Sequence, residues 1–188
     1  MSKLIDFESY PISPVLDRLL QDKTTKQNII FATDAYLENG PDFAETAQIT
    51  VDKLLGYMKI KIQPRVEKAA EEQLARTRKK AEVFTPSWIV NKMNNHCDEE
   101  WFGRPNVFNT EAGTSWVTSS APITFDRKLS WKGYVDSKRL EITCGEAPYI
   151  VSRYDAATGD IIPIKDRIGI LDRKLRVVSE NAADDTEW

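Results

Sequence analysis

The stretch "LEITCGEAPYIVSRYD", residues Leu140–Asp155, decides the fold. Its first part, Leu140 to Thr143, is a short run with β-branched residues, which favour strands, and it ends at Cys144 and Gly145. In a parallel α/β domain, a strand that runs into a glycine turn brings backbone amides to the sheet edge where ligands bind. We therefore expect an α/β fold in which this run is a strand. A plain core strand followed by a plain turn is the simpler interpretation of these residues alone.

Two residues of this stretch are candidates for contact with a ligand. Glu141 lies on the expected strand, and its carboxylate could accept hydrogen bonds from an amine or a hydroxyl group of the ligand. Gly145 has no side chain, so the backbone could approach a ligand closely at that point. Both residues would then lie at one end of the expected strand.

The chain breaks at Phe84, Thr85 and Pro86, between two predicted helices. The alanine-rich segment 64–84 begins with a proline and predicts the first helix, and the apolar spacing in residues 87–97 predicts the second. Thr85 can cap the second helix, whose free first-turn amides would also favour an anionic or carboxylate-bearing ligand. Phe84 or Trp88 could stack on a flat ring of that ligand. An ordinary capped helix explains the break equally well.

The remaining segments predict helices at both ends of the chain and an irregular section between them. Helical spacing of apolar residues occurs in residues 13–25 and again in residues 167–181. Residues 101–138 are rich in Gly, Ser, Thr and Pro, which predicts loops and short strands. We expect the aromatic side chains of that section to form its core, although exposed rings could stack on bases. These aromatic residues are Trp101, Phe102, Phe108, Trp116, Trp131 and Tyr134.

Charge is unevenly distributed in a chain with a net charge of −3 and a pI of about 5.4. Residues 59–80 contain eight basic and three acidic side chains. A basic segment in an acidic protein can bind phosphates of DNA, but a solvated helix is the more common explanation. The candidates for phosphate contact are Arg76, Arg78, Lys79 and Lys80.

Composition excludes several classes of protein. With 41% apolar residues in 188 positions the chain can bury a core, and no segment is apolar for the roughly 20 residues that a membrane-spanning helix needs. With one histidine and two cysteines, a metal site would have to take several of its ligands from carboxylates, and no phosphate-binding P-loop occurs. Cysteine usage fits a reducing compartment, so we expect a cytoplasmic protein without a membrane partner.

Four stretches together resemble one family of proteins. They are "DRLLQDKTTKQNIIFATDAY", "ARTRKKAEVFTPSWIVNKMNN", "YVDSKRLEITCGEAPYIVSRYD" and "DRIGILDRKLRVVSEN". The chain resembles the N-terminal part of restriction endonuclease subunit M, a group of S-adenosylmethionine-dependent adenine-N6 DNA methyltransferases of restriction–modification systems. The resemblance implies a helical arm over residues 1–80. It also implies, over residues 81–188, the beginning of a Rossmann-like class I methyltransferase domain with an incomplete sheet.

The resemblance assigns a cofactor pocket to two segments of this sequence. The family's Phe-Thr-Pro motif matches Phe84, Thr85 and Pro86, which would line the pocket for the methionine end of S-adenosylmethionine. Its acidic cofactor loop, followed by Cys-Gly, matches Glu141, Cys144 and Gly145. In this chain Ile142 replaces the usual proline, and Glu146 and Ala147 replace a small residue and a second glycine.

The resemblance also implies that the chain alone is not a complete enzyme. The family binds a flipped adenine with a motif of the form Asn/Asp/Ser-Pro-Pro-Tyr/Phe, and no such tetrapeptide occurs in these 188 residues. We therefore expect no methyl transfer by this chain alone and assign it no catalytic residue. The expected partners are DNA and either the missing C-terminal methyltransferase half or a restriction subunit. The alternative is a non-catalytic binding or decoy protein derived from a methyltransferase N-terminal half.

Overall fold

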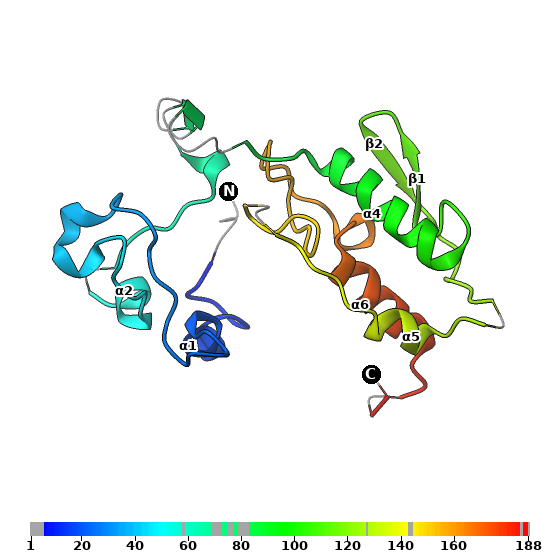
Figure 1. Ribbon diagram of the computed structural model, residues 1–188, viewed down its shortest axis with the longest axis horizontal. Helices are drawn as coiled ribbons and strands as arrows, with labels where there is room; N and C mark the ends of the chain where they lie inside the picture. The colour runs from blue at the N-terminus through cyan, green and yellow to red at the C-terminus, as the bar shows by residue number, and fades with distance from the viewer. Residues whose placement is uncertain are drawn as a thin grey trace. The chain divides into compact units, whose positions relative to one another are not determined.

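The computed structural model describes residues 6–57, 59–68, 73–74, 77–78, 83–126, 128–142, 145–184 and 186–187. The chain divides into two compact units, Met1–Gln63 and Pro64–Trp188 (Figure 1). Each unit has its own hydrophobic core and is described separately. The fold is mixed and mostly helical, with a two-stranded antiparallel sheet in the second unit.

The first unit consists of short helical segments around a small apolar core. Its elements are η1 (Ser13–Val15), α1 (Leu16–Leu20), η2 (Leu37–Asn39), η3 (Pro41–Phe43) and α2 (Val51–Leu55). The core is formed by Leu16, Leu20, Phe31, Phe43, Ile49, Leu54 and Ile60. The helix predicted in residues 13–25 is therefore present but shorter, because the backbone is already extended at Gln21.

The described part of the second unit consists of helices, a hairpin and long connecting loops. Its elements are η4 (Arg65–Glu67), α4 (Ser87–Phe102), β1 (Asn109–Ala112), β2 (Ser115–Thr118), α5 (Trp131–Asp136), η5 (Ile164–Asp166) and α6 (Ile170–Asn181). α6 lies beside α5, and the hairpin lies beside α4 (Figure 1). α4 and α6 confirm the helices predicted after the break and near the C-terminal end.

The core of the second unit is aromatic. Phe102, Phe108 and Tyr134 are buried together with Ile123 and Val177, and neighbouring rings pack with tilted or edge-on geometry. Other aromatic rings, including those of Trp101 and Trp131, pack against this cluster. The prediction that the aromatic residues of the irregular section form its core is confirmed for these side chains.

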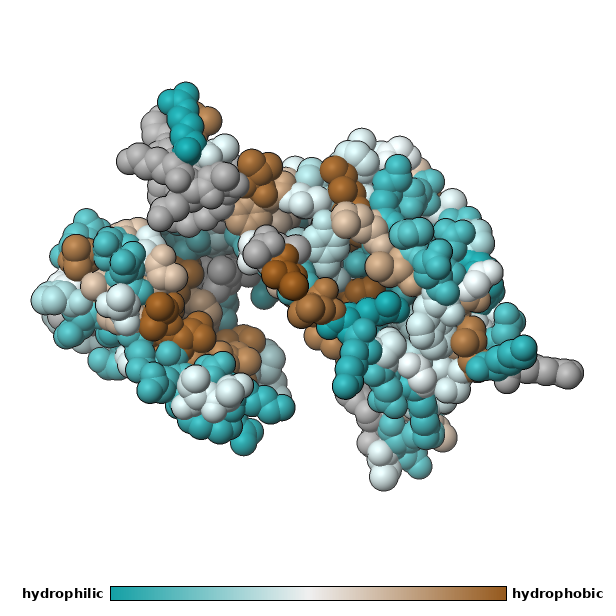
Figure 2. Space-filling model, in the orientation of Figure 1, coloured by the Kyte–Doolittle hydropathy of each residue, from teal (hydrophilic) through white to brown (hydrophobic). Residues whose placement is uncertain are grey.

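The structure does not contain the strand predicted for residues 140–142, and residue 143 lies outside the described residues. Residues 140–142 have no regular secondary structure, and the described part of the chain contains no parallel sheet. A strand needs a neighbouring strand, and no strand pairing among the described residues involves this segment. As a result Leu140 and Ile142 are 83% and 63% exposed, and hydrophobic surface is visible over this part of the unit in Figure 2.

The observed sheet lies instead in the irregular section, where short strands were expected. Strands β1 and β2 pair Asn109 with Thr118 and Ala112 with Ser115. Gly113 makes the tight connection between them with φ of +63°, a value that favours glycine. The predicted basic helix over residues 64–84 is described only in part: η4 covers its start, and residues 73–74 and 77–78 are helical.

Candidate functional site

The candidate site is a loop closed by Glu141. One oxygen of its carboxylate accepts a hydrogen bond from the backbone N–H of Tyr149 at 3.1 Å, and the other accepts from the N–H of Ile150 at 3.1 Å. The side chain predicted to contact a ligand therefore holds both ends of the segment 141–150 together. A carboxylate has about four acceptor positions, so Glu141 keeps acceptor capacity in this arrangement.

The ring of Phe84 packs directly against this loop at Gly145. A Cβ atom added to Gly145 would lie 2.4 Å from Cε1 of Phe84, a distance that real Cβ atoms do not reach. Gly145 also has φ of +63°, which side chains rarely adopt. Two of the predicted cofactor residues, about 60 positions apart in the sequence, thus meet because one of them has no side chain.

The helix after the break begins differently from the prediction. α4 starts at Ser87 with Pro86 as its N-cap, and Thr85 makes no side-chain cap. Instead the carboxylate of Asp155 accepts a hydrogen bond from the Ser87 N–H at 2.6 Å. A carboxylate of the protein itself therefore binds one of the amides that the sequence analysis predicts as contacts for an anionic ligand. A negative charge is favourable at a helix N-terminus.

Hydrogen bonds control the ionisation of Asp155. Burial raises the pKa of this carboxyl, but the N–H groups of Ser87, Thr158 and Ala157 and the Ser87 hydroxyl together lower the pKa below its ordinary value of 3.8. The same carboxylate accepts from Ala157 N at 2.8 Å and from Thr158 N at 2.9 Å. Asp155 thus joins the loop after the candidate site to the start of α4.

A pocket of about 280 Å³ lies between α4 and the Glu141 loop. Met93, Asn94 and Cys97 line it from α4, while Arg139 and Glu141 line it from the chain leading into the loop. Its walls are mostly apolar, which is typical of small-molecule sites with a few polar groups. The pocket can therefore hold the apolar part of a ligand beside an acidic and a basic side chain.

Asn94 fixes the position of that pocket. Its side-chain amide is buried and donates to the carbonyl of Tyr149 at 3.0 Å and to the carbonyl of Ile168 at 2.9 Å. The Tyr149 hydroxyl in turn lies 3.1 Å from the sulfur of Met93. α4 thereby holds the far end of the Glu141 loop and the residues that lead into α6.

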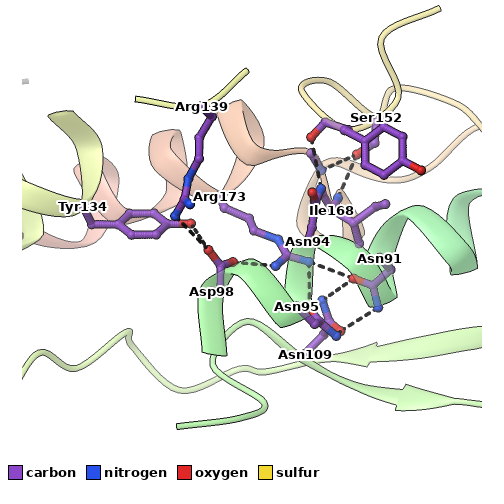
Figure 3. A network of polar contacts seen from close by, with 12 residues as sticks. Asn91, Asn94, Asn95, Asp98, Asn109, Tyr134, Arg139, Ser152, Ile168 and Arg173 are labelled. Atoms are coloured by element: carbon purple, nitrogen blue, oxygen red, sulfur yellow. Dashed lines mark hydrogen bonds and ion pairs between the residues drawn. The ribbon is translucent and has the colours of Figure 1, made fainter. Parts of the chain in front are cut away.

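A buried polar network lies next to this pocket (Figure 3). Arg173 on α6 is 2% exposed, and its Nη1 donates to Asp98 at 2.5 Å. Its Nη2 donates to the side-chain oxygens of Asn91 at 2.8 Å and Asn95 at 2.9 Å. Asn91 also exchanges two hydrogen bonds of 2.9 Å with Asn109 at the start of β1. The network joins α4, α6 and the hairpin.

Two further side chains converge on Asp98. The Tyr134 hydroxyl on α5 donates to it at 2.9 Å, and burial together with the nearby Asp98 charge raises the pKa of Tyr134 far above its ordinary value. Arg139 approaches Asp98 at 3.8 Å. Within the described residues, the buried Nε and Nη2 of Arg139 have no hydrogen-bond partner. Asp98 is therefore the carboxylate on which α4, α5 and α6 meet.

The sequence analysis missed this network, although a signal for it exists. Asn91, Asn94, Asn95 and Asp98 recur at helical spacing in a segment predicted to be helical, and such a polar stripe is uncommon on a buried face. The partner, Arg173, is 75 positions from Asp98. No local pattern identifies a partner at that separation.

The remaining predicted residues are placed as follows. Thr85 and Pro86 are partly buried next to α4, and Arg78 is exposed on a helical segment. Cys144, Arg76, Lys79 and Lys80 lie outside the described residues. Among the described residues, no group of three potential metal ligands occurs, and no helix there has the length and apolar character to cross a membrane.

Comparisons with protein-family models, with curated proteins and with solved structures find no match to this chain. The function proposed for the site therefore depends on the geometry and chemistry of its own residues.

Asp98→Asn should be strongly destabilising, because it leaves the buried Arg173 guanidinium without its counter-charge. Breaking a buried ion pair costs about 3–5 kcal/mol, whereas Tyr134→Phe removes one hydrogen bond to the same carboxylate and should cost about 2 kcal/mol. Urea denaturation of the two variants measures both losses. Equal losses would show that Arg173 does not depend on the charge of Asp98.

The stabilisation from Asp155 should disappear in acid. Because the pKa of Asp155 is lower in the folded state than in the unfolded chain, its contribution is present above the ordinary value of 3.8 and is lost as the pH falls through the folded value. Asp155→Asn should therefore lower the free energy of unfolding at pH about 7 and match the wild type in acid below the folded pKa. Urea titrations across this range measure the effect, with Asp126→Asn, an exposed aspartate, as control. A difference that persists unchanged in acid would contradict the assignment.

Proposed function

We propose that this chain is the cofactor-binding front part of an S-adenosylmethionine-dependent adenine-N6 DNA methyltransferase of a restriction–modification system. The observation that carries the proposal is the contact of Phe84 with Gly145. The family resemblance assigns these residues, from two separate segments, to one cofactor pocket. Their meeting supports that assignment.

The residues around this contact suit the methionine end of the cofactor. The Phe84 ring packs on the backbone at Gly145, so the two residues form one surface against which a ligand could lie. Glu141 lines the adjacent pocket with acceptor capacity for an ammonium or hydroxyl group. S-adenosylmethionine would supply an electrophilic methyl group for transfer to an adenine amine, and in this chain Phe84, Thr85, Pro86, Glu141, Cys144 and Gly145 would hold it.

The proposal also includes a Rossmann-like sheet and a partner that completes it. Leu140 and Ile142 would become part of the first strand of a Rossmann-like sheet whose other strands come from the remaining methyltransferase half. Their large exposure supports a surface that such strands would cover. Because the sequence contains no base-binding Pro-Pro motif, the methyl transfer itself requires that other half.

Gly145→Ala should weaken binding of S-adenosylmethionine by about tenfold, because the new methyl group collides with the Phe84 ring and overpacking of this kind costs about 1–3 kcal/mol. Isothermal titration of the full chain measures the affinity. Gly113→Ala is a matched control, since Gly113 has the same φ of +63° but nothing within 4 Å of its added Cβ. It carries the same backbone strain without the collision.

A second variant separates the collision from general damage to the loop. Phe84→Ala in the Gly145→Ala background removes the colliding ring, so the double variant should lose little more affinity than Phe84→Ala alone. Absence of cofactor binding by the wild-type chain, or equal losses in Gly145→Ala and Gly113→Ala, would contradict the proposed pocket.

The proposed DNA contact is the basic segment that contains Arg76, Arg78, Lys79 and Lys80. Changing all four to alanine should reduce the slope of log K against log salt for duplex DNA by about 3–4, since each phosphate contact contributes about 0.9. The control changes four exposed basic residues elsewhere, namely Arg18, Lys23, Lys26 and Lys128. An unchanged slope in the first variant, or the same decrease in both, would remove this segment from the DNA interface.

A further inference from the structure

A second cavity, of about 300 Å³, lies between β2, η5 and α6, away from the Glu141 loop. Lys165 and Arg167 line it from η5 and the residue after it, and Arg173 and Arg176 line it from α6. Thr118 lines it from β2. Four cationic side chains from two elements therefore surround one small volume in the second unit.

The acidic side chains near this cavity already have hydrogen-bond partners. Asp172 lines it and accepts from the backbone N–H and the hydroxyl of Ser152. Asp166 accepts from the Thr118 hydroxyl at 2.9 Å. The other two acids are the direct partners of the α6 arginines, Asp98 with Arg173 and Glu180 with Arg176. The cations on η5 and after it have no such close carboxylate.

The cationic residues that line the cavity are unequally paired. Lys165 is exposed and forms no ion pair within the described residues, and Arg167 approaches its nearest carboxylate, that of Asp172, only to 3.8 Å. In the same part of the chain, the buried Nε atoms of Arg167 and Arg173 have no hydrogen-bond partner. These Nε atoms are buried from solvent, so an anion in the cavity would be attracted by the charges of Lys165 and Arg167 and not by the unpartnered Nε groups.

We propose that the cavity between β2, η5 and α6 binds a phosphate group. A phosphate presents several strong acceptor oxygens and a negative charge, which match the Lys165 ammonium group and the Arg167 guanidinium, whose ion pair with Asp172 is long at 3.8 Å. The group belongs either to a free phosphate monoester or to the backbone of a nucleic acid. Arg176 is the least available donor, because Glu180 and the carbonyls of Ser119 and Ala121 already fix its guanidinium. Lys165 and Arg167 are therefore the main contacts.

The proposal does not depend on the proposed methyltransferase function. Phosphate binding at this cavity and cofactor binding at the Glu141 loop involve different side chains and different ligands. A chain that fails to bind S-adenosylmethionine can still bind phosphate here, so the two hypotheses fail separately.

The test titrates the full chain with inorganic phosphate, using chloride at the same ionic strength as the reference. Lys165→Gln and Arg167→Gln should each weaken phosphate binding by about tenfold, the usual effect of losing one charge-assisted hydrogen bond. Lys128→Gln is the matched control, because Lys128 is exposed and does not line the cavity. Thermal unfolding of each variant verifies that it remains folded.

Two results would overturn the proposal. One is a wild-type chain that shows no phosphate binding beyond the chloride reference. The other is a loss in Lys165→Gln and Arg167→Gln no greater than the loss in Lys128→Gln. Either result would assign these cations to surface charge alone.

A second titration, with duplex DNA, identifies the source of the phosphate. If the cavity contacts a nucleic-acid backbone, Lys165→Gln should reduce the salt slope by about 1. If it holds a free phosphate monoester, the slope should stay unchanged while inorganic phosphate still binds. Both outcomes support a phosphate site.

Discussion

The buried charge of Arg173 is the constraint on which the second unit depends. A guanidinium that is 2% exposed requires an opposite charge and acceptors at defined angles. Asp98 supplies the charge, and Asn91 and Asn95 supply neutral acceptors on the same face of α4. Hydrophobic packing alone would tolerate a rotation or a slide of α6 against α4, whereas these hydrogen bonds do not. The network therefore sets the register between the two helices.

The candidate site is positioned by that register. Once α4 is fixed, Asn94 reaches the carbonyls of Tyr149 and Ile168, which hold the end of the Glu141 loop and the start of α6. Within the loop, the carboxylate of Glu141 and the contact at Gly145 add further closures. The described part of this segment contains no helix or strand and is thus held by hydrogen bonds to its ends.

Sequence patterns identified the parts of this unit that are decided locally. The helices α4 and α6 follow from apolar spacing, and the short strands follow from the turn-rich texture around Gly113. The strand expected at Leu140 failed because strand formation requires a neighbour, which a local run does not reveal. The predicted cap of α4 by Thr85 was wrong for a related reason, because the carboxylate that binds the first-turn amide belongs to Asp155, 68 positions away in the sequence. For the candidate site, the sequence indicated Phe84, Glu141 and Gly145 but not the network that supports them.

Arginine residues that line the two cavities described above approach the same carboxylate. Arg139 lines the pocket at the Glu141 loop and Arg173 lines the cavity beside η5, yet both guanidinium groups approach Asp98. An anion bound near Arg173 would supply part of its counter-charge and leave more of the field of Asp98 to Arg139. Charged ligands in both cavities would therefore act on the same carboxylate, and linkage would require any coupling between them to be equal in both directions. Asp98 is the residue through which any such coupling would pass.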